Sequence, residues 1–257
     1  MIIKRSTWSI PYLIFLILFV VIHLGLIMVY AFMDGSGHFT LSNFTKFFQD
    51  KDSLATFALS IEVALETTVI CLLLGYPAAW ILTNKKLNRS AVTIILFILP
   101  MWVNALMRTL ATAELFTMFG FTLGKGTLLY GMVYDYLPFM IYPIYNILQK
   151  MDPSYSEAAI DLGATPWKVF WKVTVPLSKP GIISGVMMVF MPTVSTFAIS
   201  EFLTNNKIKL FGTIIQEKIY ASMWNYGAAL ALVMLIIIGI TSMFTDKDAD
   251  SAEGGLI

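Results

Sequence analysis

Five carboxylates lie within or at the edges of long apolar stretches, where ionised groups are uncommon. They are Glu62, Glu66, Glu114, Asp135 and Glu201, and Arg108 is the only basic residue among them. An ionised side chain at the centre of a membrane helix costs about 2.5–3.5 kcal/mol on insertion scales, so such groups tend to face a polar path or each other. The pattern is typical of a cation path. The alternative is that Glu62, Glu66 and Glu201 lie at the water interface and that Asp135 pairs with Arg108.

Aromatic side chains accompany these carboxylates along the sequence. An aromatic face attracts an ammonium group through the ring quadrupole. We therefore expect Asp135 and Glu114 to contact a cationic substrate. The other members of the predicted path are Trp102, Tyr134, Tyr142 and Glu201, and Tyr136 adds a further aromatic face.

The sequence contains no constellation that supports catalysis. Its two histidines, His23 and His38, are isolated, and its single cysteine, Cys71, excludes both an intrachain disulfide and a CxxC metal or redox motif. A phosphate-binding Gly-x-x-x-x-Gly-Lys-Ser/Thr loop is also missing from the sequence. We therefore expect a protein that is not an enzyme, holds no metal, and takes its energy from another chain.

The composition predicts that the elements positioning these residues cross a membrane. Hydrophobic residues make up 58% of the 257 residues and charged residues 13%, against about 25% charged residues in a typical globular domain. The net charge of +1 leaves no basic excess for binding nucleic acid. A spanning helix needs about 20 mostly apolar residues. Six stretches qualify: Ile10–Phe32, Ala55–Asn84, Ala91–Phe119, Thr127–Gln149, Gly181–Leu203 and Tyr226–Thr245.

The distribution of lysine and arginine predicts the orientation of these spans. Basic residues gather at the N-terminus, after the second span and after the fourth span. Because cytoplasmic loops carry an excess of Lys and Arg, both termini and the 150–180 loop are predicted to be cytoplasmic. We expect one multi-pass domain over residues 1–245 and a polar, disordered cytoplasmic tail over residues 246–257.

The 150–180 loop has the helix start and stop signals of a helical hairpin. Asp152-Pro153-Ser154 predicts a helix start, because proline suits a first turn and Asp or Ser can cap it. Ser154 and Glu157 also have the spacing of a capping box. Gly163 predicts a left-handed stop, and Thr165-Pro166 predicts a second start.

The second helical segment of this hairpin is predicted to be amphipathic. Trp167, Phe170 and Trp171 stand at i, i+3 and i+4 and form one aromatic face, whereas Lys168 and Lys172 form another. Such a hairpin either lies on the membrane surface with its lysines at lipid headgroups or docks a soluble partner. Pattern alone leaves both interpretations open.

A sequence motif in this hairpin resembles a known family. Glu157-Ala158-Ala159, then Gly163, then Val173-x-Val175-Pro176 is similar to the EAA loop of binding-protein-dependent ABC importer permeases, which often have Ile and Leu where this chain has valines. Further segments resemble the PotB-like branch of the spermidine/putrescine permease subfamily. They are Leu74-Gly75-Tyr76-Pro77-Ala78-Ala79-Trp80, Leu99-Pro100-Met101-Trp102-Val103-Asn104 and Leu137-Pro138-Phe139-Met140. The resemblance covers about the first 235 residues.

This resemblance implies an all-α, type I (MetI-like) permease fold in the bacterial cytoplasmic membrane. The EAA loop then forms a coupling helix that docks on a homodimeric ATPase, which binds ATP and Mg²⁺. Further partners are a second, homologous permease and an extracytoplasmic substrate-binding protein, and the cargo is a polyamine. The implied coupling residues are Glu157, Ala158, Ala159, Asp161, Gly163, Trp167 and Pro176. The alternatives are a secondary transporter or channel that uses the carboxylates, and an ABC permease for another small solute.

Overall fold

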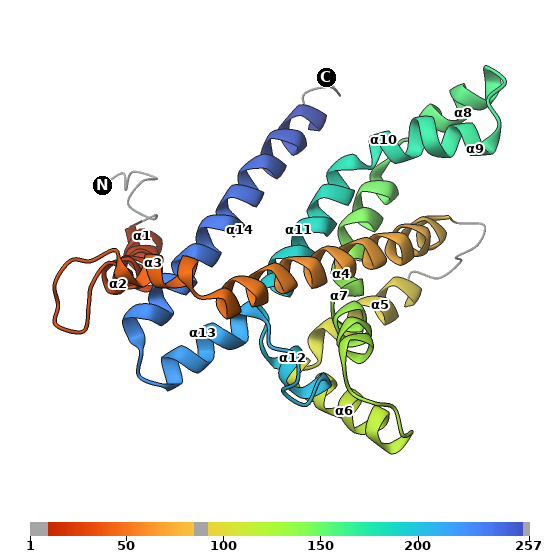
Figure 1. Cartoon of the computed structure of the whole chain (residues 1–257). Coiled ribbons are helices and arrows are strands. Elements are labelled where there is room, and N and C mark those ends of the chain that lie inside the picture. The colour runs from red at the N-terminus through yellow and green to blue at the C-terminus, as the bar shows by residue number, and fades with distance from the viewer. Residues whose placement is uncertain (1–9, 85–91, 254–257) are drawn as a thin grey trace. The chain divides into compact units, whose positions relative to one another are not determined.

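The computed structural model describes residues 10–84 and 92–253, with side chains described up to residue 242 (Figure 1). Within these ranges the chain is helical, and its only β-type pairing is a bridge between Met33 and Phe39. Two compact units are present, the smaller comprising residues 1–55 and 214–237 and the larger comprising residues 56–213 and 238–257. The larger unit contains most of the residues predicted to have a function.

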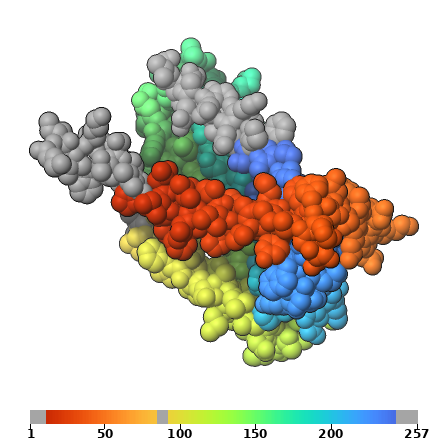
Figure 2. Space-filling view, turned by 90° about the vertical axis from the view of Figure 1, so that its left-hand side faces the viewer, coloured from red at the N-terminus to blue at the C-terminus, as the bar shows by residue number. Residues whose placement is uncertain are grey.

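The first apolar stretch forms a continuous helical segment built from α1 (Ile10–Leu16), the π-helical turn η2 (Ile17–Val21) and α2 (Ile22–Ala31). The side chains of residues 11–30 are exposed or half-exposed, and Figure 2 shows these first helices (red) at the surface. Apolar side chains exposed in this way need lipid or another protein around them. The segment is followed by α3 (Ser42–Gln49), a short helix with three phenylalanines.

In the described part of the chain, three helical segments are long and apolar enough to cross a membrane. They are Pro11–Ala31, α4 (Lys51–Thr83) and residues Trp224–Ser242 of α14 (Trp224–Glu253). Two bent helix pairs raise the number to five if each pair forms one span. Helix α7 (Lys125–Lys150) has 26 residues, or about 39 Å at 1.5 Å per residue, but is not among these five. The count of six spans therefore stays a prediction.

The predicted third span, Ala91–Phe119, is not one helix. It consists of α5 (Val92–Ile98), the 3₁₀ turn η3 (Leu99–Trp102) and α6 (Ala105–Met118), with a bend of 91° between the two halves. Pro100 lies in the turn, and the Asn104 side chain caps α6 by accepting hydrogen bonds from the backbone N–H groups of Leu106 (2.9 Å) and Met107 (3.3 Å). An N-cap side chain of this kind begins a new helix instead of continuing the old one.

The predicted fifth and sixth spans also differ from the structure at their ends. Helix α11 (Lys179–Ser195) stops before the expected Leu203, and a separate α12 (Ala198–Leu203) follows, because Thr196 is extended. Helix α13 (Phe211–Tyr220) follows α12. Helix α14 continues to Glu253, and the disorder predicted for the tail over residues 246–257 stays a prediction.

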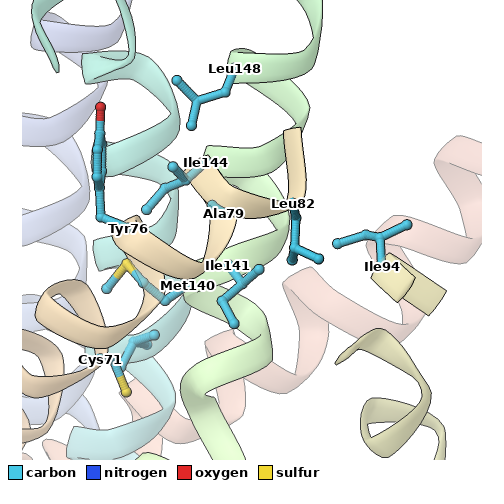
Figure 3. Packing of buried hydrophobic residues seen from close by; sticks show 10 residues of the cluster. Cys71, Tyr76, Ala79, Leu82, Ile94, Met140, Ile141, Ile144 and Leu148 are labelled. Carbon is cyan, nitrogen blue, oxygen red and sulfur yellow. The ribbon is translucent and has the colours of Figure 1, made fainter. Parts of the chain in front are cut away.

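The core of the larger unit joins α4, α5, α7 and α11. Its buried side chains are Cys71, Tyr76, Ala79, Leu82, Ile94, Met140, Ile141, Ile144, Leu148 and Val189 (Figure 3). Small residues let membrane helices approach closely, and Gly185 does so here, because a Cβ atom on it would lie 2.7 Å from Met140 Sδ. The Tyr76 hydroxyl lies 2.9 Å from Ser178 Oγ in the same region. This packing holds α7 and α11 together and so positions the residues that follow.

Candidate functional site

A cavity of about 500 Å³ lies in the larger unit where helices are interrupted. Its lining comes from the break between η3 and α6, the middle of α7, and the break between α11 and α12. The residues are Met101, Trp102, Val103, Asn104, Ala105, Leu106, Arg108, Thr109, Asp135, Tyr136, Phe139, Thr196, Ala198 and Ile199. Ligand sites in proteins are typically apolar clefts of this size with a few polar groups. In this cavity the charged groups are Arg108 and Asp135.

Arg108 and Asp135 form a buried ion pair that joins α6 to α7. Arg108 Nη2 lies 2.9 Å from Asp135 Oδ1, and the two side chains are 8% and 3% exposed. The Thr109 hydroxyl donates to Asp135 Oδ2 at 3.2 Å. The guanidinium carbon of Arg108 lies 5.5 Å from the centre of the Tyr134 ring, within cation–π range. The pairing is the one that the sequence left open as an alternative to a free cation site.

The structure brings together only part of the predicted substrate path. Trp102 and Asp135 line the cavity, as does Tyr136. Tyr134 does not line the cavity, but its ring contacts Arg108. Glu114, Tyr142 and Glu201 lie outside the described lining, and Glu114 is exposed. A role for any of these residues in transport stays a prediction.

A second charged cluster was missed by the sequence interpretation. Lys125 Nζ, at the start of α7, donates to Glu62 Oε1 at 2.6 Å and to Glu66 Oε1 at 3.0 Å on α4. Arg108 is therefore not the only basic residue among the carboxylates. The signal was the lysine in the short loop before Thr127, but Lys125 and Glu62 lie 63 positions apart in the sequence, and helix packing alone brings them together.

The predicted hairpin is present as α8 (Ser154–Asp161) followed by α9 (Pro166–Val169), the π-helical turn η4 (Phe170–Thr174) and α10 (Val175–Leu177). Asp152 Oδ1 accepts a hydrogen bond from Ser154 N at 2.9 Å. Hydrogen bonds from Ser154 hold the pKa of the Asp152 carboxyl below its usual range. The predicted reciprocal capping by Ser154 and Glu157 is not formed, since Asp152 already supplies the acceptor, and Glu157 is exposed.

Gly163 ends α8 in the left-handed conformation that the sequence predicted, with φ = +81°. Gly163 N donates to Ile160 O at 2.8 Å, and Ala164 N donates to Ala159 O at 3.0 Å. These two bonds have the pattern of a Schellman motif, in which a glycine tolerates positive φ at little cost. Thr165 then caps α9 by accepting from Lys168 N at 3.4 Å.

The hairpin presents an apolar surface that the rest of the described chain leaves uncovered. Leu162 is 89% exposed and Trp167 is 70% exposed, and Tyr155, Ile160 and Trp171 are also exposed. Behind them, Phe170 packs at 5.7 Å between ring centres on Tyr76 and at 6.0 Å on Trp80, both in α4. The surface is thus attached to the α4 helix through aromatic contacts. Leu162 was not among the residues singled out from the motif.

Comparison with known proteins defines the class to which this fold and this hairpin belong. The family described as "Binding-protein-dependent transport system inner membrane component" matches residues 71–246. The chain belongs to this family, whose members are ABC importer permeases. It is therefore a transport subunit of the bacterial inner membrane and not an enzyme.

The most informative relatives carry spermidine/putrescine names. The chain is 32% identical over 220 residues to the spermidine/putrescine transport system permease protein PotB of Escherichia coli (strain K12), covering 79% of this chain and 80% of the relative. It is 30% identical over 249 residues to PotB of Haemophilus influenzae, covering 88% and 87%. The predicted PotB-like resemblance is confirmed.

A solved structure confirms the fold. A chain of a bacterial ABC transporter involved in the import of the acidic polysaccharide alginate aligns with a TM-score of 0.72 at 19% identity, covering 95% of this chain and 98% of that one. At this identity the likeness concerns the fold alone. The predicted all-α permease fold is therefore confirmed.

Proposed function

We propose that this chain is one permease subunit of an ATP-driven importer of polyamines. The observation that carries the proposal is the 32% identity to PotB over 79% of the chain. A binding protein delivers the polyamine on the extracytoplasmic side, and the permease passes it inward by alternating access. ATP and Mg²⁺ are bound by the separate ATPase chain.

The cavity supports a cationic cargo. Asp135 supplies a carboxylate, and Trp102 and Tyr136 supply aromatic faces in the same lining. Apolar side chains such as Met101, Phe139 and Ile199 line the same cavity and suit the hydrocarbon segments of a polyamine. Glu114, Tyr134, Tyr142 and Glu201 belong to the proposed path outside this cavity.

The hairpin from α8 to α10 is the proposed docking element for the ATPase. The apolar surface around Leu162 and Trp167 supports it, because exposed apolar clusters mark interaction sites. Glu157, Ala158, Ala159, Asp161, Gly163 and Pro176 complete the proposed coupling residues. This role requires the hairpin to lie in the cytoplasm, and the proposed six spans put both chain termini on the same side.

Further partners are proposed from the class of transporter. A second permease of the same fold would complete the pathway and cover part of the exposed helices α1 and α2. An alginate ABC transporter of similar fold, with a TM-score of 0.62, was solved in complex with a periplasmic protein that carries an alginate pentasaccharide. A substrate-binding protein is the corresponding partner proposed here.

The alternative of a secondary cation transporter is weakened by the pairing of the carboxylates. Glu62 and Glu66 share Lys125, and Asp135 faces Arg108, so three of the five acidic groups already have a basic partner. A relay of protons or cations needs carboxylates that are open to the moving ion. An ABC permease for another solute is the remaining alternative, because a probable sulfate permease of Chlorella vulgaris is 27% identical over 210 residues.

The energy source separates these alternatives. In energised membrane vesicles that contain the assembled transporter and its binding protein, we expect spermidine uptake to continue when an uncoupler collapses the proton gradient while ATP is kept constant. Depletion of ATP with the gradient intact should stop uptake. The reverse result, collapse by the uncoupler alone, would favour the secondary transporter.

A further inference from the structure

The two side chains of the Arg108–Asp135 ion pair differ in their hydrogen-bond partners. Asp135 accepts from the Thr109 hydroxyl in addition to facing Arg108. The Arg108 guanidinium places Nη2 against Asp135 and lies over the Tyr134 ring, but its Nε and Nη1 are buried without a hydrogen-bond partner in the described part of the chain. Asp135 thus has a hydrogen bond from the Thr109 hydroxyl, which also reaches Ala105 O at 2.9 Å, whereas two of the three guanidinium nitrogens of Arg108 have none.

The contact between the two groups is itself ionic. Nη2 and Oδ1 lie 2.9 Å apart, yet Oδ1 has no aligned hydrogen-bond donor. Arginine forms its strongest pairs through two parallel N–H···O bonds, and this geometry is not present here. Buried donors without partners are destabilising, so a position in which Nε and Nη1 find acceptors would compete with the paired position.

The position of the pair makes this competition relevant to transport. Arg108 and Asp135 both line the 500 Å³ cavity. Arg108 lies in the first turn of α6, four residues after the Asn104 cap that begins the helix. The face of Tyr134, 5.5 Å from the guanidinium carbon, offers the cation an aromatic contact that does not depend on Asp135.

We propose that Arg108 is an internal cation that occupies the Asp135 site when the cavity holds no substrate, and that a substrate ammonium group displaces it. This inference rests on the proposed function, since it assumes a cationic cargo. With Arg108 paired, the two charges in the cavity cancel, and a passing cation finds no uncompensated carboxylate. Only a cation that displaces the guanidinium can form an ion pair with the Asp135 carboxylate. Arg108 therefore determines which cations the cavity holds, and it releases a bound cation when its guanidinium pairs with Asp135 again.

The proposal predicts a gain of binding on removal of the guanidinium. An internal cation that occupies Asp135 about nine-tenths of the time lowers the apparent affinity for a competing ligand about tenfold. In the importer purified with its partner chains but without the binding protein, we expect Arg108→Gln to bind radiolabelled spermidine about tenfold more tightly than wild type. Arg108→Lys retains a cation beside Asp135 and serves as the matched control, with affinity close to wild type.

Substitution of Asp135, which accepts the contact from Arg108, gives the second control. Asp135→Asn should bind spermidine less tightly than wild type, and Arg108→Gln combined with Asp135→Asn should lose the gain. A purely structural pair gives the opposite pattern, because each single change leaves a buried charge unpaired and the double change relieves it. Unchanged or weaker binding by an assembled Arg108→Gln importer would overturn the proposal, as would a gain that persists in the double variant.

A measurement on the unmodified chain covers the case in which Arg108→Gln does not assemble. The sequence has three arginines, Arg5, Arg89 and Arg108, and phenylglyoxal modification of each can be followed by mass spectrometry. Saturating spermidine should increase modification of Arg108 and leave Arg5 and Arg89 unchanged. Protection or no change at Arg108 would contradict displacement. Wild-type spermidine uptake in the same preparation tests the proposed function separately, and its absence would overturn both.

Discussion

Replacing Gly163 with valine is expected to leave the permease in the membrane and to reduce ATP-driven uptake by about 5–30-fold. Gly163 has φ = +81°, and no atom lies within 4 Å of a Cβ built on it. A side chain there has space but adopts the left-handed conformation at a cost of about 1–2 kcal/mol. That strain favours opening the turn that closes on Ala159 and Ile160. The turn sets the direction of α9 relative to α8, so the docking surface loses its geometry.

The control at the same position is Gly163→Asn. Asparagine adopts positive φ more readily than a β-branched residue, so it should retain most of the uptake. The measurements are the amount of permease in the membrane, the amount of ATPase that co-purifies with it, and uptake. Normal uptake by Gly163→Val at normal abundance would contradict a role for this turn in coupling.

Leu162→Asp is the change with the second large expected effect. Leu162 is 89% exposed, so its replacement removes almost no packing within this chain. A carboxylate in the centre of an apolar interface must be desolvated without a partner, which costs several kcal/mol. We expect the ATPase to dissociate from the permease and uptake to fall to background, with the permease itself stable.

Met118→Asp serves as the matched control for Leu162→Asp. Met118 is an apolar side chain of α6 that is 79% exposed and lies outside the hairpin. The same change there should leave the co-purified ATPase unchanged. Retention of the ATPase by Leu162→Asp would exclude this surface as the docking site.

Most features that depend on local sequence were predictable, although the capping box of Ser154 and Glu157 is not formed. Gly163 and Thr165 act within three or four residues of their own positions, and both are found as predicted. The aromatic face of Trp167, Phe170 and Trp171 follows from helical spacing in the same way, with ring centres 5.2–6.0 Å apart. Local patterns also identified the long apolar segments.

Features that depend on tertiary contacts were not predictable. The third span was predicted as one helix, but a turn at Pro100 and a new helix start capped by Asn104 accompany a 91° bend. The contact of Lys125 with Glu62 joins residues far apart in the sequence. The pairing of Arg108 with Asp135 was foreseen only as one of two possibilities, because the sequence holds no information on which side chain faces which.

The most direct test of the central claim is transport by the reconstituted importer. Proteoliposomes that contain this chain, its partner permease and the ATPase are supplied with the binding protein and radiolabelled spermidine or putrescine. We predict accumulation that requires both ATP on the ATPase side and the binding protein. If neither polyamine accumulates while the same proteoliposomes import another solute with ATP, the assignment of polyamines as the cargo is contradicted. Accumulation without ATP would contradict the assignment of an ABC importer.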